Sequence, residues 1–192
     1  MRAEDTDECI KILQTGGVTV MPTDTVYGVV CRAADEHAVE RLYRLKSREK
    51  KPGTVIAASI EQLTGLGIKR RYLTAVSQFW PGAVSVEIPH DLAYLNQGTG
   101  RQALRVVKEE WLADMLAQTG PLLTSSANLP GEPTSADIDE AKGYFSDKVD
   151  FYLDGGRLEA RKPSTLIRVV DDAIEVLREG TVKINEAGEI VK

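Results

Sequence analysis

The sequence predicts an α/β fold built on one twisted, mixed β-sheet with flanking helices. Helix-type and strand-type segments alternate through most of the chain, and three strand-type segments follow one another near its end. No repeat or Pro/Gly/Ser-rich linker divides the 192 residues, and a chain of this length has room for one full core. We therefore expect residues 1–192 to form a single domain, with no second domain.

The helices are predicted from apolar residues spaced three and four positions apart. In the first, Cys9, Ile12 and Leu13 share one face, and Gly16-Gly17 ends the helix. Later, Pro81-Gly82 ends another helix in the same way. In chain order, the expected helices are residues 5–15, 36–46, 60–66, 71–79, 109–118 and 137–144.

The strands are predicted from short apolar runs. Residues 18–21 form the first, which Pro22 ends, and residues 84–88 alternate apolar and polar side chains as a strand with one covered face does. In chain order, the expected strands are residues 18–21, 54–58, 84–88, 103–107, 121–124, 151–153, 165–170 and 174–177.

Composition narrows the class of protein. Apolar residues make up 42% of the chain and charged residues 28%, as in soluble globular proteins, and the net charge of −5 argues against a general nucleic-acid binder. No apolar run approaches the ~20 residues that a membrane span needs. The acidic start lacks a secretory leader, and Cys9 and Cys31 lack both CxxC spacing and a disulfide framework. We expect a cytoplasmic protein with reduced thiols and no membrane contact.

Several common kinds of site are not expected. His37 and His90 are the only histidines, and neither has a Cys, His or carboxylate cluster beside it, so no protein-ligated metal is expected. The chain has no GxxxxGK[ST] phosphate loop. Ser125 and Ser126 lack the GxSxG context of a hydrolase nucleophile.

The stretch PTDTVYG, residues 22–28, follows the first expected strand directly. Two hydroxyls and a carboxylate stand at the carboxyl end of this strand, where α/β sheets place ligands, and Gly28 frees the backbone. A local turn whose side chains bond only to the nearby backbone explains the same residues. On its own, the stretch favours the local turn.

A basic run lies within this acidic protein. Residues 41–51 contain six Lys or Arg residues in eleven. Cations in the last turn of a helix complement its dipole. Lys46 and Arg48, however, leave the helix at a Pro/Gly-containing loop, where both can face one multivalent anion. A solvated charged surface and an anion site are equally compatible with the run.

Small polar side chains end the strand in PLLTSSAN, residues 121–128. Thr124, Ser126 and Asn128 alternate, so in extended geometry they project toward the same side. Hydroxyl and amide groups in such a row suit a phosphate or a sugar. Thr134 and Ser135 are expected to cap the next helix. A capping loop without a ligand is the alternative.

Two arginines and a serine stand at other strands. Arg105 lies within an apolar strand, Arg178 follows the last one, and Ser164 opens the strand at Thr165. Taken singly, each arginine is more simply explained as an outward-facing surface residue, and Ser164 as turn chemistry.

Together these stretches resemble the TsaC/YrdC family of L-threonylcarbamoyladenylate synthases. The resemblance covers about residues 8–182, and each motif occurs in the order and approximate spacing of the family. The motifs are Pro22–Gly28, Lys46-x-Arg48, Trp80-Pro81-Gly82, Ser126-x-Asn128, Ser164-Thr165 and Arg178-x-Gly180. With this resemblance, the alternatives become less favoured: a local turn for residues 22–28, a charged surface for residues 41–51 and a capping loop for residues 121–128.

The resemblance implies a YrdC-like domain whose sheet curls around a concave, basic cavity. It implies a nucleotidyltransferase that joins L-threonine, bicarbonate or CO2, and ATP into threonylcarbamoyl-AMP and pyrophosphate, for the t6A modification of tRNA. Mg2+ would accompany the ATP. A downstream threonylcarbamoyl transferase would take the product, and weak direct contact with tRNA is left open.

The resemblance also implies roles for single residues. Lys46 and Arg48 would be catalytic. Arg48, Ser126, Asn128, Thr134 and Arg178 would bind ATP, and the threonine would lie among Thr25, Arg105, Thr124 and Ser164. Replacing Lys46 or Arg48 by alanine is expected to abolish product formation and to leave the thermal melt nearly unchanged.

Two other functions remain open on the sequence. The first is a carbamoyl-adenylating domain like that of hydrogenase-maturation carbamoyltransferases, which would use carbamoyl phosphate. The second is an RNA-binding or ribosome-assembly module using residues 41–51, against which the net charge and the scarcity of aromatic residues near this run count.

Overall fold

A computed structural model gives the fold, and it describes residues 2–47, 50–158, 161–171, 173–185 and 188–191. A nine-stranded sheet runs through the molecule in the order β7-β1-β2-β6-β3-β5-β4-β8-β9. It is mixed, because β1–β7, β3–β5 and β4–β8 pair in parallel and its other neighbours pair antiparallel. These strands are Thr19–Pro22 (β1), Tyr27–Arg32 (β2), Thr54–Ala57 (β3), Val84–Pro89 (β4), Arg101–Val106 (β5), Leu122–Ser126 (β6), Phe151–Tyr152 (β7), Thr165–Val170 (β8) and Ala173–Arg178 (β9).

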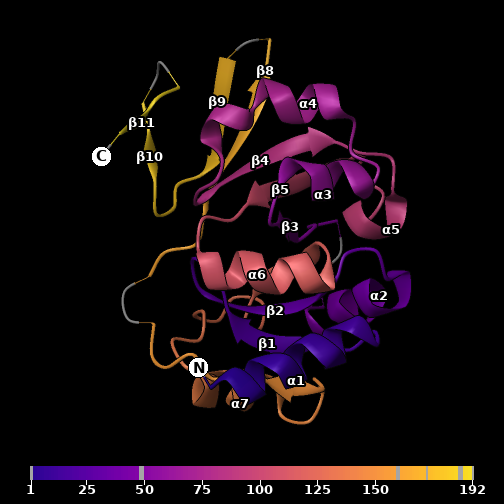
Figure 1. Ribbon diagram of the computed structural model, residues 1–192. Coiled ribbons are helices and arrows are strands. Elements are labelled where there is room, and N and C mark those ends of the chain that lie inside the picture. Colours follow the sequence, from indigo (N-terminus) through magenta and orange to yellow (C-terminus); the bar gives the residue numbers. More distant parts are fainter. Residues whose placement is uncertain (1, 48–49, 159–160, 172, 186–187, 192) are drawn as a thin grey trace.

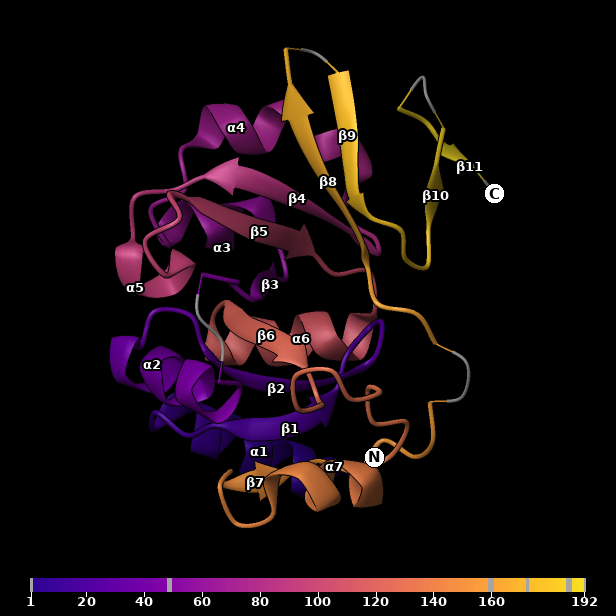
Figure 2. The ribbon, with the colours of Figure 1, turned by 180° about the vertical axis from the view of Figure 1, so that it is seen from behind.

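Helices lie along both faces of this sheet (Figures 1 and 2). The β8–β9 hairpin lies at the opposite end of the sheet from β1 and β7, and the small β10–β11 hairpin, Lys183–Ile184 with Ile190–Val191, stands beside β9. The helices are Ala3–Gln14 (α1), Glu36–Leu45 (α2), Ile60–Gly65 (α3), Arg70–Ala75 (α4), Ala93–Asn96 (α5), Glu110–Thr119 (α6) and Ile138–Phe145 (α7), with a 3-10 turn at Ser77–Phe79.

The central strands are covered on both faces, which explains their continuous apolar runs. In β1, β2, β3 and β6, successive side chains alternate between two hydrophobic clusters. In β2, Val29 belongs to the larger cluster, which includes residues of α2 and α7, and Val30 belongs to the cluster that α1 and α6 form. In β3, Val55 belongs to the larger cluster and Ile56 to the cluster of α1 and α6.

The α/β fold with a mixed sheet is confirmed, and every predicted helix and strand has a counterpart. Four elements were missed: β2, α5 and the two strands of the last hairpin. The start of β2 follows the turn residues of PTDTVYG and resembles part of that turn in sequence, although Val29-Val30-Cys31 forms a fully buried run. The predicted helix at residues 71–79 is divided, because α4 ends at Ala75 and a 3-10 turn follows. No helix in the described part of the chain is both long and apolar enough to cross a membrane.

The carboxylate of Asp150 ties three elements together near the edge of the sheet. It accepts a 2.7 Å hydrogen bond from the Val18 backbone, directly before β1, and a 3.0 Å bond from Nη2 of Arg41 in α2. Burial acts to raise the pKa of Asp150, but these donors outweigh it and hold the pKa below its ordinary value of 3.8. A carboxyl whose pKa is lowered by folding stabilises the protein fully above its ordinary pKa, and this effect is lost as the pH falls from there through the lowered pKa of the folded state.

We therefore expect the stability of the unmodified protein to fall more steeply below about pH 4 than that of Asp150→Asn, which cannot titrate. At pH 7 the variant should be the less stable of the two. Urea denaturation from pH 7 to pH 3 measures both effects. Asp147→Asn, at an exposed neighbouring carboxylate, is the control and should follow the unmodified protein. Parallel curves for Asp150→Asn and the unmodified protein would contradict the prediction.

Candidate functional site

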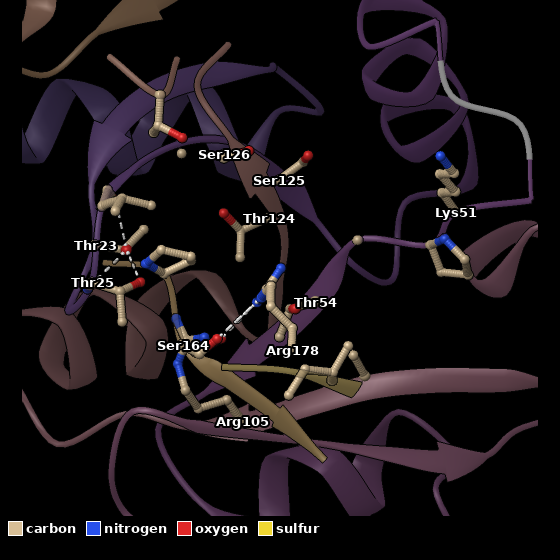
Figure 3. Close-up of a pocket in the computed structure, with 18 of the residues that line it drawn as sticks. Thr23, Thr25, Lys51, Thr54, Arg105, Thr124, Ser125, Ser126, Ser164 and Arg178 are labelled. Carbon is tan, nitrogen blue, oxygen red and sulfur yellow. Dashed lines mark hydrogen bonds between the residues drawn. The ribbon is translucent and has the colours of Figure 1, made fainter. Parts of the chain in front are cut away.

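A cavity of about 370 Å3 is lined by the turn between β1 and β2 and by residues of β2, β3, β4, β5, β6, β8 and β9. Alternate residues of a strand, and residues paired across neighbouring strands, point to the same face of a sheet. Three of the lining residues, Gly28, Thr124 and Arg105, therefore lie on the face that carries Val30 and Ile56. In Figure 3, Thr23 and Thr25 lie on one side of the cavity, and the side chain of Arg178 is directed toward Ser164, to which it is hydrogen-bonded. Its polar and charged lining residues are Thr23, Thr25, Lys50, Lys51, Thr54, Glu87, Arg105, Thr124, Ser125, Ser126, Thr134, Ser164 and Arg178.

The turn between β1 and β2 serves the local backbone and the cavity at once. The Thr23 hydroxyl donates to the Val26 carbonyl (2.7 Å) and accepts from the Thr25 backbone (3.2 Å), which is the local turn that the sequence favoured. The Thr25 hydroxyl lies 3.2 Å from that of Thr23 and lines the cavity. The stretch PTDTVYG is therefore both a local turn and part of the cavity wall, so each of the two alternatives considered for it holds in part.

Tyr27, from the same stretch, holds the backbone at Gly155 and Gly156, which follow β7. Its phenol donates to the Gly156 carbonyl (2.8 Å) and accepts from the Gly155 backbone (2.9 Å). Burial raises the pKa of Tyr27, which keeps the phenol protonated and able to donate.

Arg105 is buried in β5 and paired with Asp24. Their side chains are 3% and 5% exposed. The guanidinium donates a hydrogen bond to each carboxylate oxygen, from Nη2 at 2.7 Å and from Nε at 3.1 Å. The outward-facing placement considered for Arg105 is therefore wrong. A buried charge persists only when it is paired and hydrogen-bonded, so Asp24 is what allows Arg105 to line the cavity.

A row of hydrogen bonds continues from Arg105 to Arg178. The Nη1 group of Arg105 donates to the Ser85 hydroxyl (3.1 Å), which lies 2.8 Å from the Ser164 hydroxyl. Arg178 donates to the carbonyl of Ser164 (2.9 Å) and to its hydroxyl (3.2 Å). β4, β5 and β9 each supply one member and Ser164 directly precedes β8, so the pairing of these four neighbouring strands sets the row.

A second cavity of about 320 Å3 adjoins the first, with Ser126 and Lys51 lining both. At its wall, Lys46 is buried, and its ammonium donates to the Ser126 carbonyl (2.6 Å) and to both the carbonyl and Oδ1 of Asn128. The Ser126 hydroxyl also donates to Oδ1 of Asn128 (2.7 Å). Lys46 thus holds the turn that follows β6.

The row predicted for Thr124, Ser126 and Asn128 is divided between the two cavities. Thr124 and Ser126 line the first cavity, whereas Asn128 lies beyond the end of β6 and lines the second. Arg48, the other predicted catalytic residue, lies outside the described residues.

The capping role expected for Thr134 and Ser135 is wrong. Asp137 caps α7 by accepting a 3.0 Å hydrogen bond from the Glu140 backbone. The Ser135 hydroxyl instead donates to the Ala127 carbonyl (2.6 Å), and this bond ties the segment to the end of β6. Thr134 is thereby brought to the wall of the first cavity.

Sequence reasoning missed several residues of this site. Asp24 was noticed as a carboxylate and Lys50 and Lys51 as part of the basic run, but none was assigned to a site. The fully buried Ser85 gave no signal at all, because a serine in an alternating strand usually faces solvent. Of the charged residues lining the first cavity, four are cationic, Lys50, Lys51, Arg105 and Arg178, and Glu87 is anionic.

Gly28 is required at its position because β2 passes close to Thr124. A Cβ on Gly28 would lie 2.4 Å from Oγ1 of Thr124. We expect Gly28→Ala to lower the free energy of unfolding by about 1–3 kcal/mol, the usual cost of overpacking. Urea denaturation measures it. The matched control is Gly143→Ala in α7, where a Cβ meets nothing within 4 Å and should be neutral or stabilising. Equal stability of the two variants would contradict the prediction.

Comparison with known proteins gives a match over most of the chain. The family model Sua5_yciO_yrdC, described as "Telomere recombination", matches residues 11–180. A putative threonylcarbamoyl-AMP synthase from Mycobacterium leprae is 31% identical over 196 residues, which cover 99% of this chain and 89% of that protein. A threonylcarbamoyl-AMP synthase from Stutzerimonas stutzeri is 35% identical over 162 residues, covering 81% of this chain and 88% of that protein.

A solved structure is similar as well. The crystal structure of P. abyssi Sua5 complexed with L-threonine superposes with a TM-score of 0.81 at 27% identity. The match covers 92% of this chain, which spans 54% of the length of the P. abyssi protein.

Proposed function

Since the chain belongs to the Sua5/YciO/YrdC family, we propose that it is an L-threonylcarbamoyladenylate synthase, a nucleotidyltransferase that forms threonylcarbamoyl-AMP and pyrophosphate from L-threonine, bicarbonate or CO2, and ATP. The observation that carries the proposal is the gathering of Thr25, Arg105, Thr124 and Ser164 in one cavity directly beside a second, lysine-bordered one. These four residues come from four distant parts of the sequence.

The first cavity would take the threonine. Arg105 has five N–H donors, of which Asp24 and Ser85 occupy three, so two remain for the substrate carboxylate. The Ser164 hydroxyl adds a donor, and Thr25 and Thr124 offer hydroxyls to the polar groups of the substrate. Asp24 cancels most of the charge of Arg105, so hydrogen bonds to the substrate do more here than net charge.

The nucleotide would extend from the first cavity into the second. Ser126 borders both, Thr134 and Arg178 line the first, and Asn128 lines the second. Lys50 and Lys51 come from the basic run and also line the first cavity, where ammonium groups can meet phosphate oxygens. Mg2+ would enter with ATP as part of that substrate.

The reaction needs positioning and charge compensation more than a protein nucleophile. The threonine amine attacks the carbon of CO2 and gives up a proton, which leaves a carbamate. A carbamate oxygen then attacks the α-phosphorus of ATP, the bond from this phosphorus to the bridging oxygen breaks, and pyrophosphate leaves. Two like unit charges ~4 Å apart repel by about 4 kcal/mol at an effective dielectric near 20. Fixed cationic and hydroxyl donors that offset this repulsion and hold the reactants in line supply the catalysis.

The purified protein incubated with ATP, Mg2+, L-threonine and labelled bicarbonate tests the proposal. The expected result is a labelled adenylate and one pyrophosphate per adenylate, with neither formed when threonine is omitted. Adenylate formed from carbamoyl phosphate without threonine would favour the carbamoyl-adenylating alternative. No adenylate, together with RNA affinity that falls steeply with salt, would favour the RNA-binding alternative.

A further inference from the structure

The hydrogen-bond row between Arg105 and Arg178 has two serine hydroxyls at its centre. Ser85 is fully buried, whereas Ser164 lines the first cavity. Their oxygens are 2.8 Å apart, and each also accepts a hydrogen bond from one arginine, Ser85 from Arg105 and Ser164 from Arg178. Guanidinium groups donate and cannot accept. Both ends of the row are therefore donors.

This arrangement decides which way the two hydroxyl protons point. Only one proton can lie between the serine oxygens, so the other hydroxyl must direct its proton elsewhere. Within the described part of the chain, Arg105 and Ser164 are the only hydrogen-bond partners found for the Ser85 hydroxyl. A Ser85 proton turned away from Ser164 would be buried without an acceptor, which is costly. Ser85 therefore donates to Ser164, and the Ser164 proton is left to point into the cavity.

We propose that Ser85 is a positioning residue that fixes Ser164 as a hydrogen-bond donor to the substrate. A fixed donor favours an oxygen without a proton, such as a carboxylate, and disfavours an ammonium group. This inference rests on the proposed function, because it takes threonine as the occupant of the cavity. It adds a residue outside the cavity lining that determines how threonine is oriented, with its carboxylate toward Ser164 and Arg105.

A purely structural role for Ser85 predicts something different. If its hydroxyl only completes the hydrogen bonding of Arg105, its loss weakens threonine binding by the same factor whether or not Ser164 has a hydroxyl. If Ser85 acts through the direction of the Ser164 proton, its loss matters only while that proton is present. A double-mutant cycle separates the two roles.

The experiment measures the dissociation constant of L-threonine by calorimetry for the unmodified chain, Ser85→Ala, Ser164→Ala and the double variant. We expect Ser85→Ala to weaken binding about tenfold, and less than twofold when Ser164 is already alanine. In the adenylate assay, the KM for threonine should rise about tenfold, while kcat and the KM for ATP change less than twofold. Ser85→Thr keeps the hydroxyl and should stay within threefold of the unmodified chain.

The control is Ser77→Ala, which removes an exposed hydroxyl bonded to the Thr74 carbonyl and should change nothing. If Ser85→Ala melts too low to measure, Ser85→Cys replaces it in the same cycle, since a thiol is a weaker donor. Unchanged threonine binding, or an equal loss with and without the Ser164 hydroxyl, overturns the inference and leaves the proposed function standing. Failure of the unmodified chain to bind threonine overturns both.

Discussion

Asp24→Ala is expected to lower the free energy of unfolding by about 3–5 kcal/mol, because it leaves the buried guanidinium of Arg105 without its carboxylate. The pair is 3% and 5% exposed, and both carboxylate oxygens are engaged, so solvent cannot replace the lost partner. Urea denaturation at pH 7 measures the loss. Threonine binding should fall with it, since Arg105 is then free to leave the cavity wall.

The control for this variant is Asp91→Ala, at a carboxylate that is 91% exposed and lies 3.8 Å from Lys69. Exposed pairs of this kind are worth about 0–1 kcal/mol. A second variant that also replaces Arg105 by methionine should recover much of the stability, because no buried charge is then left unpaired. A loss below about 1 kcal/mol for Asp24→Ala would contradict the buried-pair argument.

Lys46→Ala is expected to abolish adenylate formation and also to lower the free energy of unfolding by about 3 kcal/mol. The ammonium of Lys46 donates to the Ser126 carbonyl and to both oxygens of Asn128, and its removal takes a charged donor away from all three acceptors at a half-buried turn. The sequence suggested an unchanged thermal melt for this variant. The burial of Lys46 changes that expectation.

Activity and stability of Lys46→Ala are compared with those of Lys142→Ala, whose side chain is 54% exposed. The control should match the unmodified protein in both. A Lys46→Ala variant that is inactive but fully stable would mean that Lys46 acts on the substrate alone, and an active variant would remove Lys46 from the proposed mechanism. Loss of both properties supports a role in shaping the nucleotide side of the site.

The sequence was sufficient for the fold class, since strand-type and helix-type periodicity depends on local spacing. β2 was missed because Pro, Asp and Gly in residues 22–28 marked a turn, and only the pairing of Gly28 with Ser126 reveals the strand that follows. The four residues predicted for threonine line one cavity, because each stands at or near the end of a strand.

The sequence could not show which residues distant along the chain contact one another. Asp24 meets Arg105 across 81 positions, and Ser85 meets Ser164 across 79, so neither contact leaves a trace in local spacing. The burial of Lys46 likewise depends on where the turn after β6 lies. These contacts also decide the chemistry, since they determine which charges are cancelled and which protons are free.

The chain order of the site residues has a consequence for protein synthesis. The pair of Asp24 and Arg105 precedes β8 and β9 in the chain, whereas the hydrogen-bond row that starts at Arg105 is completed only by Arg178 in β9. On the ribosome, an emerging chain would hold Arg105 beside Asp24 long before β8 and β9 could dock on β4. Catalysis would therefore be silent until Arg178 has been synthesised and β9 has paired with β8, and truncation before residue 165 should yield a protein that consumes no ATP.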